Sequence, residues 1–159
     1  MFGFFKRKEK ENVIYSPCNG QIVPLTEVPD PVFSEKVLGD GFAVIPAEGK
    51  IYAPTDGEVT MVFDTLHAIT ITSTQGTELL IHIGLDTVTL AGEPFTAHVT
   101  AGDKVKKGDL LMEVDLDKIK TAGLNCITPV LINNTDAYDK ISLQKEGDVS
   151  LDEVVLKLS

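Results

Sequence analysis

Two segments near the middle of the chain have the side-chain pattern of neighbouring β-strands. Residues 67–72 alternate apolar side chains with smaller or polar ones, and residues 77–83 form a second apolar run of strand length. The polar sequence Ser-Thr-Gln-Gly at 73–76 joins them and has a length common in hairpins. The pattern therefore predicts an antiparallel hairpin in which Thr72 pairs with Thr77.

This hairpin would bring together two of the three histidines in the chain. Antiparallel partners share a constant sum of residue numbers, so the predicted register places His67 directly opposite His82, with Cβ atoms about 4.5–5.5 Å apart. A lone histidine in a strand is usually structural, whereas two histidines that converge on one face are a candidate functional site. The prediction depends on the length of the turn, because a slip of one residue would break this pairing.

The alternation also predicts which face of the second strand is buried. One face looks like core and carries Leu79, Ile81, Ile83 and Leu85. The other face is expected to carry Glu78, Leu80 and His82, joined across the ladder by His67, Ile69 and Ile71. An apolar face interrupted by two titratable rings is typical of a binding surface.

The rest of the chain predicts more strands and few helices. The sequences YSPCNGQIVPL (15–25) and YAPTDGEVTMV (52–62) share their Tyr, Pro and Gly spacing, which suggests two related halves of one β-structure. Residues 28–41 predict a short helical turn ended by Gly39, and residues 98–119 predict strand, turn, strand and the start of a helix near 117–122. Strands every 8–12 residues, divided by many glycine turns, predict an all-β, antiparallel sandwich or barrel with short helical turns.

Composition then limits the class of protein. With 159 residues, 43% of them apolar, the chain is long enough for one globular domain with a real core. A net charge of −10 disfavours nucleic acid as a partner and favours a basic patch on a protein. The two cysteines, Cys18 and Cys126, lie outside any CxxC pair and are too few for a disulfide framework, which indicates reduced thiols in the cytoplasm.

We expect residues 1–12 to form a flexible tail and residues 13–159 to form a single domain. The tail has its aromatic residues before its charges, the reverse of a secretory signal. Its basic residues beside three phenylalanines would suit a weak membrane-surface anchor, although such tails are more often simply mobile. No apolar run in the sequence approaches the length needed to span a membrane.

Several motifs resemble one known family over nearly everything from residue 13 to the end. They are APTDGEV, HAITI, ELLIHIGLDTV with GEPF beyond it, PDPVFSEKVLGDGFAV, GDKVKKGD and TPVLINN. Together they are similar to the glucose-type enzyme IIA (EIIA) domains of the bacterial phosphoenolpyruvate:sugar phosphotransferase system. The pairing of IHIGLDTV with LHAI is the most specific part of this resemblance.

The resemblance implies a fold and an activity. The fold would be a barrel–sandwich hybrid with a duplicated hybrid motif, and the protein would be a phosphotransferase component that works as a phosphocarrier. Such domains take a phosphoryl group, supplied by phosphoenolpyruvate through enzyme I, from the histidine carrier protein HPr. They then pass it to a cysteine of the EIIB domain of a sugar permease. The resemblance further implies a cytoplasmic monomer with no required cofactor and with membrane contact only through the permease. It leaves open whether the protein has regulatory protein targets.

The resemblance also assigns residue roles. His82 falls on the phosphorylated histidine, His67 on the second active-site histidine, and Thr65 on the hydroxyl that orients His67. Asp30 and Asp86 fall on carboxylates that meet partner arginines. The apolar rim against which partners dock falls on Val32, Phe33, Leu80 and Val88. Some relatives carry Phe at the position of Leu80, so this contact would be smaller here.

The residues themselves suit this chemistry. A neutral imidazole nitrogen is a competent nucleophile near pH 7. Phosphoryl transfer needs positioning and donors for developing charge, which a second ring one cross-strand spacing away could supply through its N–H. A hydrogen bond from Thr65 to the other nitrogen of that ring would fix its orientation.

Three alternatives remain open from the sequence. A zinc peptidase on a β-scaffold would need a third ligand, but Gly84 stands where an H-x-H pair would place it. We therefore expect no intrinsic metal site, although His67 and His82 could ligate zinc together with a partner's carboxylate. A lipoyl- or biotinyl-type carrier resembles residues 101–115, but the chain has no Met-Lys pair. A regulatory binding module of the same fold, without catalysis, is the third.

Overall fold

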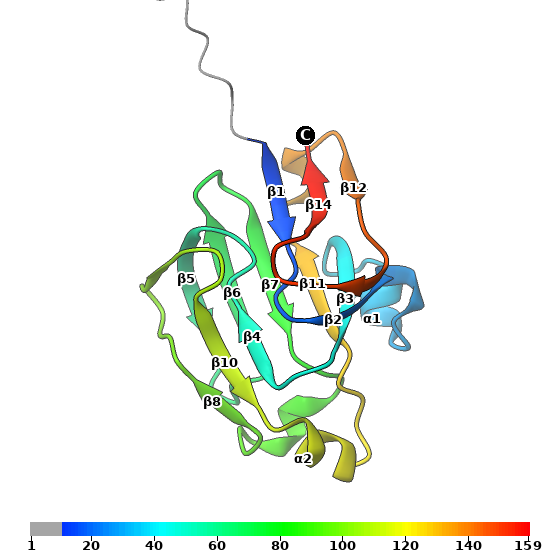
Figure 1. Cartoon of the computed structure of the whole chain (residues 1–159), viewed down its shortest axis with the longest axis vertical. Coiled ribbons are helices and arrows are strands. Elements are labelled where there is room, and N and C mark those ends of the chain that lie inside the picture. The colour runs from blue at the N-terminus through cyan, green and yellow to red at the C-terminus, as the bar shows by residue number, and fades with distance from the viewer. Residues whose placement is uncertain (1–10) are drawn as a thin grey trace, which may run out of the picture.

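The computed structural model describes residues 11–159, and these form three antiparallel sheets (Figure 1). The large sheet has the order β13(Gly147–Val149), β2(Gly20–Pro24), β3(Asp40–Pro46), β11(Thr128–Ile132), β7(Glu78–His82), β6(Ala68–Ser73), β5(Gly57–Val62), β9(Lys104–Val105). The two smaller sheets have the orders β1(Asn12–Tyr15), β14(Val154–Leu158), β12(Ile141–Leu143) and β4(Lys50–Tyr52), β10(Leu110–Val114), β8(Phe95–Ala97).

The helical segments are short. The α-helices are α1(Pro31–Ser34) and α2(Leu116–Thr121), and the 3-10 turns are η1(Leu25–Glu27), η2(Thr87–Leu90) and η3(Thr135–Ala137). None of the helices in residues 11–159 is long and apolar enough to cross a bilayer. The predicted all-β fold with short helical turns is confirmed.

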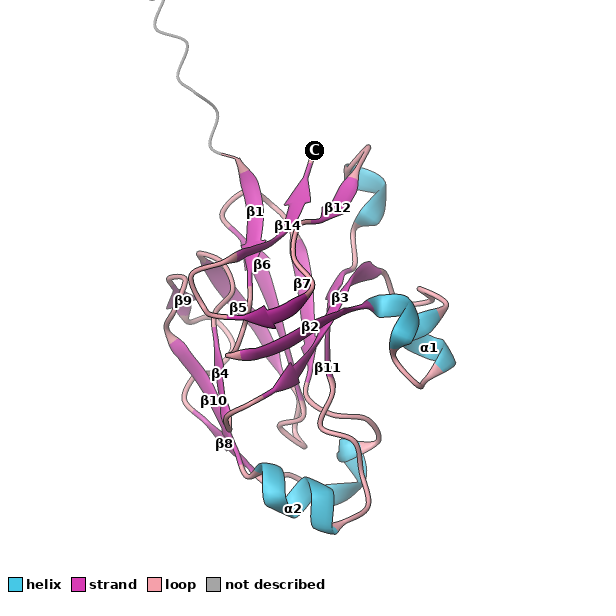
Figure 2. Cartoon of the chain, turned by 45° about the vertical axis from the view of Figure 1, so that its right-hand side comes forward, coloured by secondary structure: helices cyan, strands magenta, loops and turns pink. Residues whose placement is uncertain are grey.

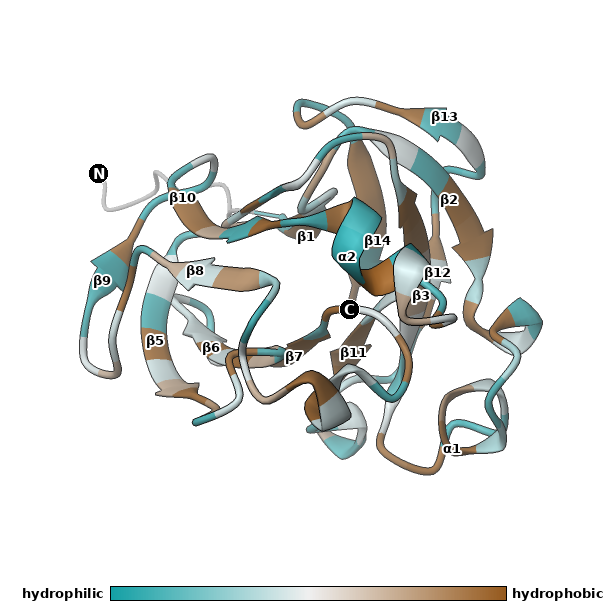
Figure 3. Cartoon of the chain, turned by 90° about the horizontal axis from the view of Figure 1, so that it is seen from below, coloured by the Kyte–Doolittle hydropathy of each residue, from teal (hydrophilic) through white to brown (hydrophobic). Residues whose placement is uncertain are grey.

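One apolar core lies between the three sheets, whose strands surround a shared interior when seen end-on (Figure 3). Alternate residues of β7, Leu79 and Ile81, point into it, and Ile83 joins them just beyond the strand. All three are at most 1% exposed, as the alternation predicted. Leu85, the fourth residue assigned to this face, lies instead in a second apolar cluster, because the chain leaves the strand after His82.

The second apolar cluster covers the outer face of the large sheet. Ala43, Ala68, Leu80 and Leu131 come from four neighbouring strands, β3, β6, β7 and β11. A segment that includes η1 and α1, at the side of the sheet in Figure 2, covers them with Leu25, Val28 and Phe33. The large sheet is therefore apolar on both faces at its centre, and the segment at 25–38 is the cover of the outer face.

The covering segment differs from the predicted helix in length. Asp30 begins α1 as its N-cap, accepting a hydrogen bond from the N–H of Val32 at 3.0 Å, with Pro31 in the first turn. The helix ends at Ser34 rather than continuing to Gly39, and Lys36 beyond it has φ +59°. A left-handed residue cannot continue a right-handed helix, so the apolar residues at helical spacing beyond it lie in turns. The predicted strand at 98–100 is also absent, because β8 ends at Ala97.

The two similar sequence segments hold each other by reciprocal hydrogen bonds. The N–H of Tyr15 donates to the carbonyl of Pro54 at 2.9 Å, and the N–H of Tyr52 donates to the carbonyl of Pro17 at 2.7 Å. Tyr and Pro occupy equivalent positions in both segments, so each segment makes the same hydrogen bond to the other. Each half then continues into an antiparallel pair, β2 with β3 and β5 with β6.

The glycine shared by both segments is required by close backbone approach. A Cβ on Gly20 would lie 2.1 Å from the carbonyl oxygen of Ile45, and a Cβ on Gly57 would lie 2.3 Å from that of Thr72. Each contact is with the backbone of a paired strand, which cannot move without breaking the ladder. Gly57 is therefore needed for strand approach, whereas Gly76, with φ +88° and open space around it, is needed only for its turn conformation.

We expect Gly57→Ala to destabilise the protein by about 2–3 kcal/mol, because an added methyl group overpacks against fixed backbone. The matched control is Gly76→Ala, which should cost only about 1 kcal/mol for the left-handed backbone. Urea unfolding of the two variants measures the difference. Equal losses would contradict the steric explanation for Gly57.

Candidate active site

The β6–β7 hairpin forms as predicted, but its register is shifted by one residue. Thr72 pairs with Glu78, and Ala68 pairs with His82. The N–H of Ser73 donates to the carbonyl of Thr77 at 2.8 Å, so the loop contains three residues, 74–76, and ends at left-handed Gly76. Pairing of Thr72 with Thr77 is therefore wrong. The predicted assignment of Ile69 and Ile71 to the face of His82 is also wrong. With the observed register, both side chains belong to the main core.

The two histidine rings nevertheless meet. His67 precedes β6 in a tight turn in which the N–H of Leu66 bonds to the carbonyl of Phe63 and Leu66 has φ +60°. This turn interrupts the alternation of the strand, so His67 does not follow the core-facing parity of Ile69. Its ring centroid lies 5.0 Å from that of His82, at an interplanar angle of 81°. The predicted juxtaposition is present, although a turn rather than a cross-strand pair produces it.

The geometry fixes the tautomer of His82. Its Nδ1 lies 2.7 Å from the carbonyl oxygen of Gly84. A carbonyl oxygen only accepts hydrogen bonds, so Nδ1 must carry the proton. In the neutral ring, Nε2 is then the nitrogen with a free lone pair.

Thr65 lies where the sequence placed it relative to His67. Its Oγ1 is 2.6 Å from Nδ1 of His67, and either atom can donate in this contact. The arrangement leaves Nε2 of His67 for another partner. His67 is 6% exposed, whereas His82 is partly exposed, so His82 is the more accessible of the two rings.

Two phenylalanines flank the histidine pair. The ring of Phe33, from α1, lies 4.9 Å from that of His82, and the ring of Phe63 lies 5.4 Å from that of His67 in an edge-on contact. These ring contacts restrict the rotamers of both imidazoles. The importance of Phe63 was not predicted, because it stands outside the hairpin; its position two residues before Thr65 was the only available cue.

Burial lowers the pKa of both histidines from the ordinary value of 6.5. For His67 the main cause is burial, with the neighbouring His82 as a second cause. For His82 burial also dominates, and it is opposed by the hydrogen bond to Gly84 and by the charges of Asp30 and Asp86. Both rings are therefore favoured in their neutral forms near pH 7.

The predicted apolar rim is only partly exposed. Val32 and Val88 are 44% and 48% exposed, as a docking surface requires. Phe33 and Leu80 are 4% and 9% exposed, so they belong to the second apolar cluster beneath the surface. Phe33 and Leu80 are buried because the outer face of the sheet needs an apolar cover, and their predicted contact with docking partners stays a prediction. Phe33 turns inward to supply this cover.

The charges of the two predicted carboxylates act on His82. Asp30 caps α1, and Asp86 precedes η2 with φ +60°. Both raise the pKa of His82 through their charges, which places them within electrostatic reach of its ring. Within residues 11–159, no group of three or more His, Cys, Asp or Glu side chains is arranged to hold a metal ion.

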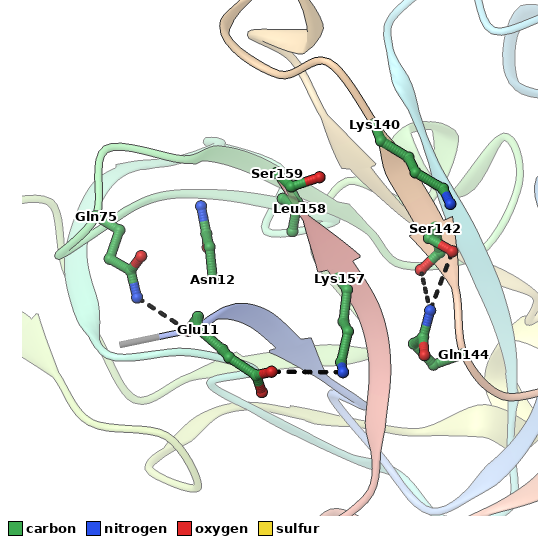
Figure 4. A pocket seen from close by; sticks show the side chains of 9 residues that line it. All are labelled: Glu11, Asn12, Gln75, Lys140, Ser142, Gln144, Lys157, Leu158 and Ser159. Carbon is green, nitrogen blue, oxygen red and sulfur yellow. Dashed lines mark hydrogen bonds and ion pairs between the residues drawn. The ribbon is translucent and has the colours of Figure 1, made fainter. Parts of the chain in front are cut away.

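A cavity of about 500 Å³ lies away from this site, at the other end of the hairpin (Figure 4). Its lining includes Gln75 from the β6–β7 loop, Glu11 and Asn12 from the start of β1, and Lys157 from β14. The side chain of Gln75 donates to the backbone carbonyl of Glu11 at 3.1 Å. The start of the described chain is thus attached to the end of the hairpin that is remote from the histidines.

Comparisons with known proteins identify the family of the chain. The family model for "phosphoenolpyruvate-dependent sugar phosphotransferase system, EIIA 1" matches residues 12–138. A glucose-specific EIIA component of Oceanobacillus iheyensis is 48% identical over 96% of this chain and 93% of that protein. The structure of glucose permease IIA from Mycoplasma capricolum superposes with a TM-score of 0.88 at 38% identity, covering 94% of this chain and 96% of that one.

Other relatives are much longer. A beta-glucoside-specific EIIBCA component of Bacillus subtilis is 52% identical over 92% of this chain, which spans only 24% of that protein. None of these similarities favours the peptidase or lipoyl-carrier alternatives. The resemblance seen in the sequence is confirmed: the chain belongs to the EIIA 1 family of the phosphoenolpyruvate-dependent sugar phosphotransferase system.

Proposed function

We propose that His82 is the residue on which this phosphotransferase component carries the phosphoryl group, receiving it from HPr and passing it to a cysteine of an EIIB domain. The observation that carries the proposal is the hydrogen bond from Nδ1 of His82 to the carbonyl of Gly84. It leaves Nε2 with a free lone pair, on the more accessible ring of the pair.

The transfer steps follow from this tautomer. The Nε2 lone pair of His82 forms a bond to phosphorus while the bond from phosphorus to the donor nitrogen of HPr breaks, and the donor ring keeps that electron pair. The proton on Nδ1 stays in place, so the phosphorylated ring carries a positive charge that the carbonyl of Gly84 stabilises. Such a ring is a good leaving group when a thiolate of EIIB attacks phosphorus and the bond from Nε2 to phosphorus breaks.

His67 is proposed as a donor to the phosphoryl oxygens. If the hydroxyl of Thr65 donates to Nδ1, the neutral ring of His67 carries its proton on Nε2. A donor held beside the nucleophile stabilises charge that develops during transfer. The two rings therefore take opposite tautomers, and the two different hydrogen-bond partners, a carbonyl and a hydroxyl, account for the difference.

The surface around the pair suits a basic protein partner. Asp30 and Asp86 supply negative charge, and Val32 and Val88 supply exposed apolar area beside it. Relatives named EIIBCA and EIICBA components, of which this chain matches 21–24%, support an EIIB domain as the acceptor. In this proposal the protein acts as a cytoplasmic monomer and needs no metal or other cofactor for transfer.

The first test is single-turnover transfer of labelled phosphate from HPr. His82→Ala should take up no label, because the nucleophile is gone. His67→Gln should still accept phosphate but transfer it about a hundred- to a thousandfold more slowly, the usual cost of removing one such donor. Intact-mass measurement of the parent protein should show one added, acid-labile phosphoryl group. Uptake by His82→Ala together with none by His67→Gln would reverse the two roles.

A second prediction concerns association with HPr. Asp30→Asn keeps the helix-capping oxygen and Asp86→Asn keeps a residue type that tolerates its positive φ, so each removes only charge. The double variant should bind HPr about three- to tenfold more slowly at low salt, and the difference should shrink as salt screens it. Glu11→Gln, at the remote end, is the control. Stopped-flow rates that do not differ at low ionic strength would exclude the two carboxylates from steering.

The pKa directions predict the acid limb of the reaction. Both histidines should titrate below 6.5 by NMR, so phosphoryl uptake should persist as pH falls through 6.5 and decline only at lower pH.

Stability should follow the same groups. The unfolded chain binds more protons than the folded protein once pH falls below 6.5, so stability present at about pH 7 is progressively lost on acidification. The double variant His67→Gln/His82→Gln should lose less stability than the parent between about pH 7 and about pH 5 in urea unfolding. Equal losses would mean that the histidines keep ordinary pKa values.

A further inference from the structure

The peptide group between Gly84 and Leu85 is held from both sides. Its carbonyl accepts from Nδ1 of His82 at 2.7 Å, and its N–H donates to the backbone carbonyl of Asn125 at 2.9 Å. A peptide group is planar and rigid, so its carbonyl and N–H can only turn together. The carbonyl of Asn125 therefore restricts the direction in which the carbonyl of Gly84 points.

The peptide group on the other side of Gly84 is fixed by Thr87. The hydroxyl of Thr87 donates to the carbonyl of Ile83 at 2.6 Å, and Thr87 is fully buried. The N–H of Ile83 in turn donates to the carbonyl of His67 at 2.7 Å. Hydrogen bonds thus hold both peptide groups that flank Gly84.

The same two residues also leave no room at Gly84. A Cβ there would lie 2.6 Å from Cγ2 of Thr87 and 3.0 Å from the carbonyl oxygen of Asn125, and the φ of +78° already disfavours a side chain. Asn125 itself is held by its side chain, whose Oδ1 accepts from the N–H of Ile127 at 2.9 Å. This is a local turn of the kind that Asn forms readily, on an exposed residue.

We propose that Thr87 and Asn125 are positioning residues for His82, which act by holding the two peptide groups around Gly84 so that its carbonyl keeps the proton on Nδ1. The inference rests on the proposed role of His82 as the nucleophile. The chain of hydrogen bonds from Asn125 through the peptide to the imidazole also polarises the ring and increases the basicity of Nε2. Partners that orient metal-bound histidines in this way change activity about ten- to a hundredfold when removed.

The experiment combines NMR of the unphosphorylated protein with single-turnover uptake of phosphate from HPr. Nitrogen-15 spectra of the imidazoles report the tautomer of neutral His82, and the pH dependence of uptake reports its titration. The variants are Thr87→Val, which keeps the shape but removes the hydroxyl, and Asn125→Ala, which removes the acceptor for Ile127. The matched variants Thr87→Ser and Asn125→Ser keep a hydroxyl that can make each bond.

We expect Thr87→Val to give a mixture of His82 tautomers, with uptake reduced about ten- to a hundredfold, and Asn125→Ala to act in the same direction more weakly. Both serine variants should restore the single Nδ1–H tautomer and most of the rate. If Thr87→Val does not fold, the exposed Asn125 decides the question, because its replacement leaves the core intact.

Two results would overturn the proposal. In one, the single variants Thr87→Val and Asn125→Ala both fold, and in each of them His82 keeps the Nδ1–H tautomer and phosphate uptake keeps the parent rate. In the other, a serine variant reduces the rate of phosphate uptake as much as the Val or Ala variant at the same position does. Failure of His82 as the nucleophile is a separate outcome, because it appears as uptake by His82→Ala while the tautomer spectra of the parent stay as expected.

Discussion

The hydrogen bond between Nδ1 of His82 and the carbonyl of Gly84 is the constraint on which the rest of the site depends. The bond requires the chain to turn back sharply after β7. Gly84 makes this turn with a left-handed φ, at a position where a side chain would have no room. It also divides the two ring nitrogens into one that is fixed and one that can react. An imidazole without this bond would be free to exchange tautomers, and the molecules with the proton on Nε2 would present a protonated nitrogen to the phosphoryl group.

The site lies where the cover of the large sheet ends. The inner face of the sheet is packed against the main core, and its outer face is packed under the segment that contains α1. Phe33 belongs to that cover and also lies against His82. Packing energy that stabilises the fold therefore also immobilises the nucleophile, and this is why a partly exposed ring can remain ordered without a second hydrogen bond.

Much of this arrangement could be predicted from the sequence. The alternation of β7 identified Leu79, Ile81 and Ile83 as core, and the repeated Tyr-Pro-Gly segments indicated a duplicated β-structure. The hairpin register was wrong by one residue, because sequence does not distinguish a three-residue loop ending in left-handed Gly76 from a four-residue one.

The meeting of His67 with His82 could not be derived correctly by counting along strands. It depends on Leu66 in a left-handed conformation, which no propensity of leucine would suggest. Likewise, exposed and buried positions in the segment around Phe33 are set by the sheet beneath it, so local sequence alone could not separate Val32 from Phe33.

The attachment of Glu11 to the loop of the β6–β7 hairpin has a consequence for tethering. His67 is six residue steps along the chain from Ser73, so the histidines lie about 20 Å from the point at which any preceding segment joins the domain. A tether at that point would act as a pivot behind the domain and leave the reactive face free to turn outward. The length of the linker would then set the effective concentration of a partner on the same tether. The linker would not compete with that partner for the surface around His82.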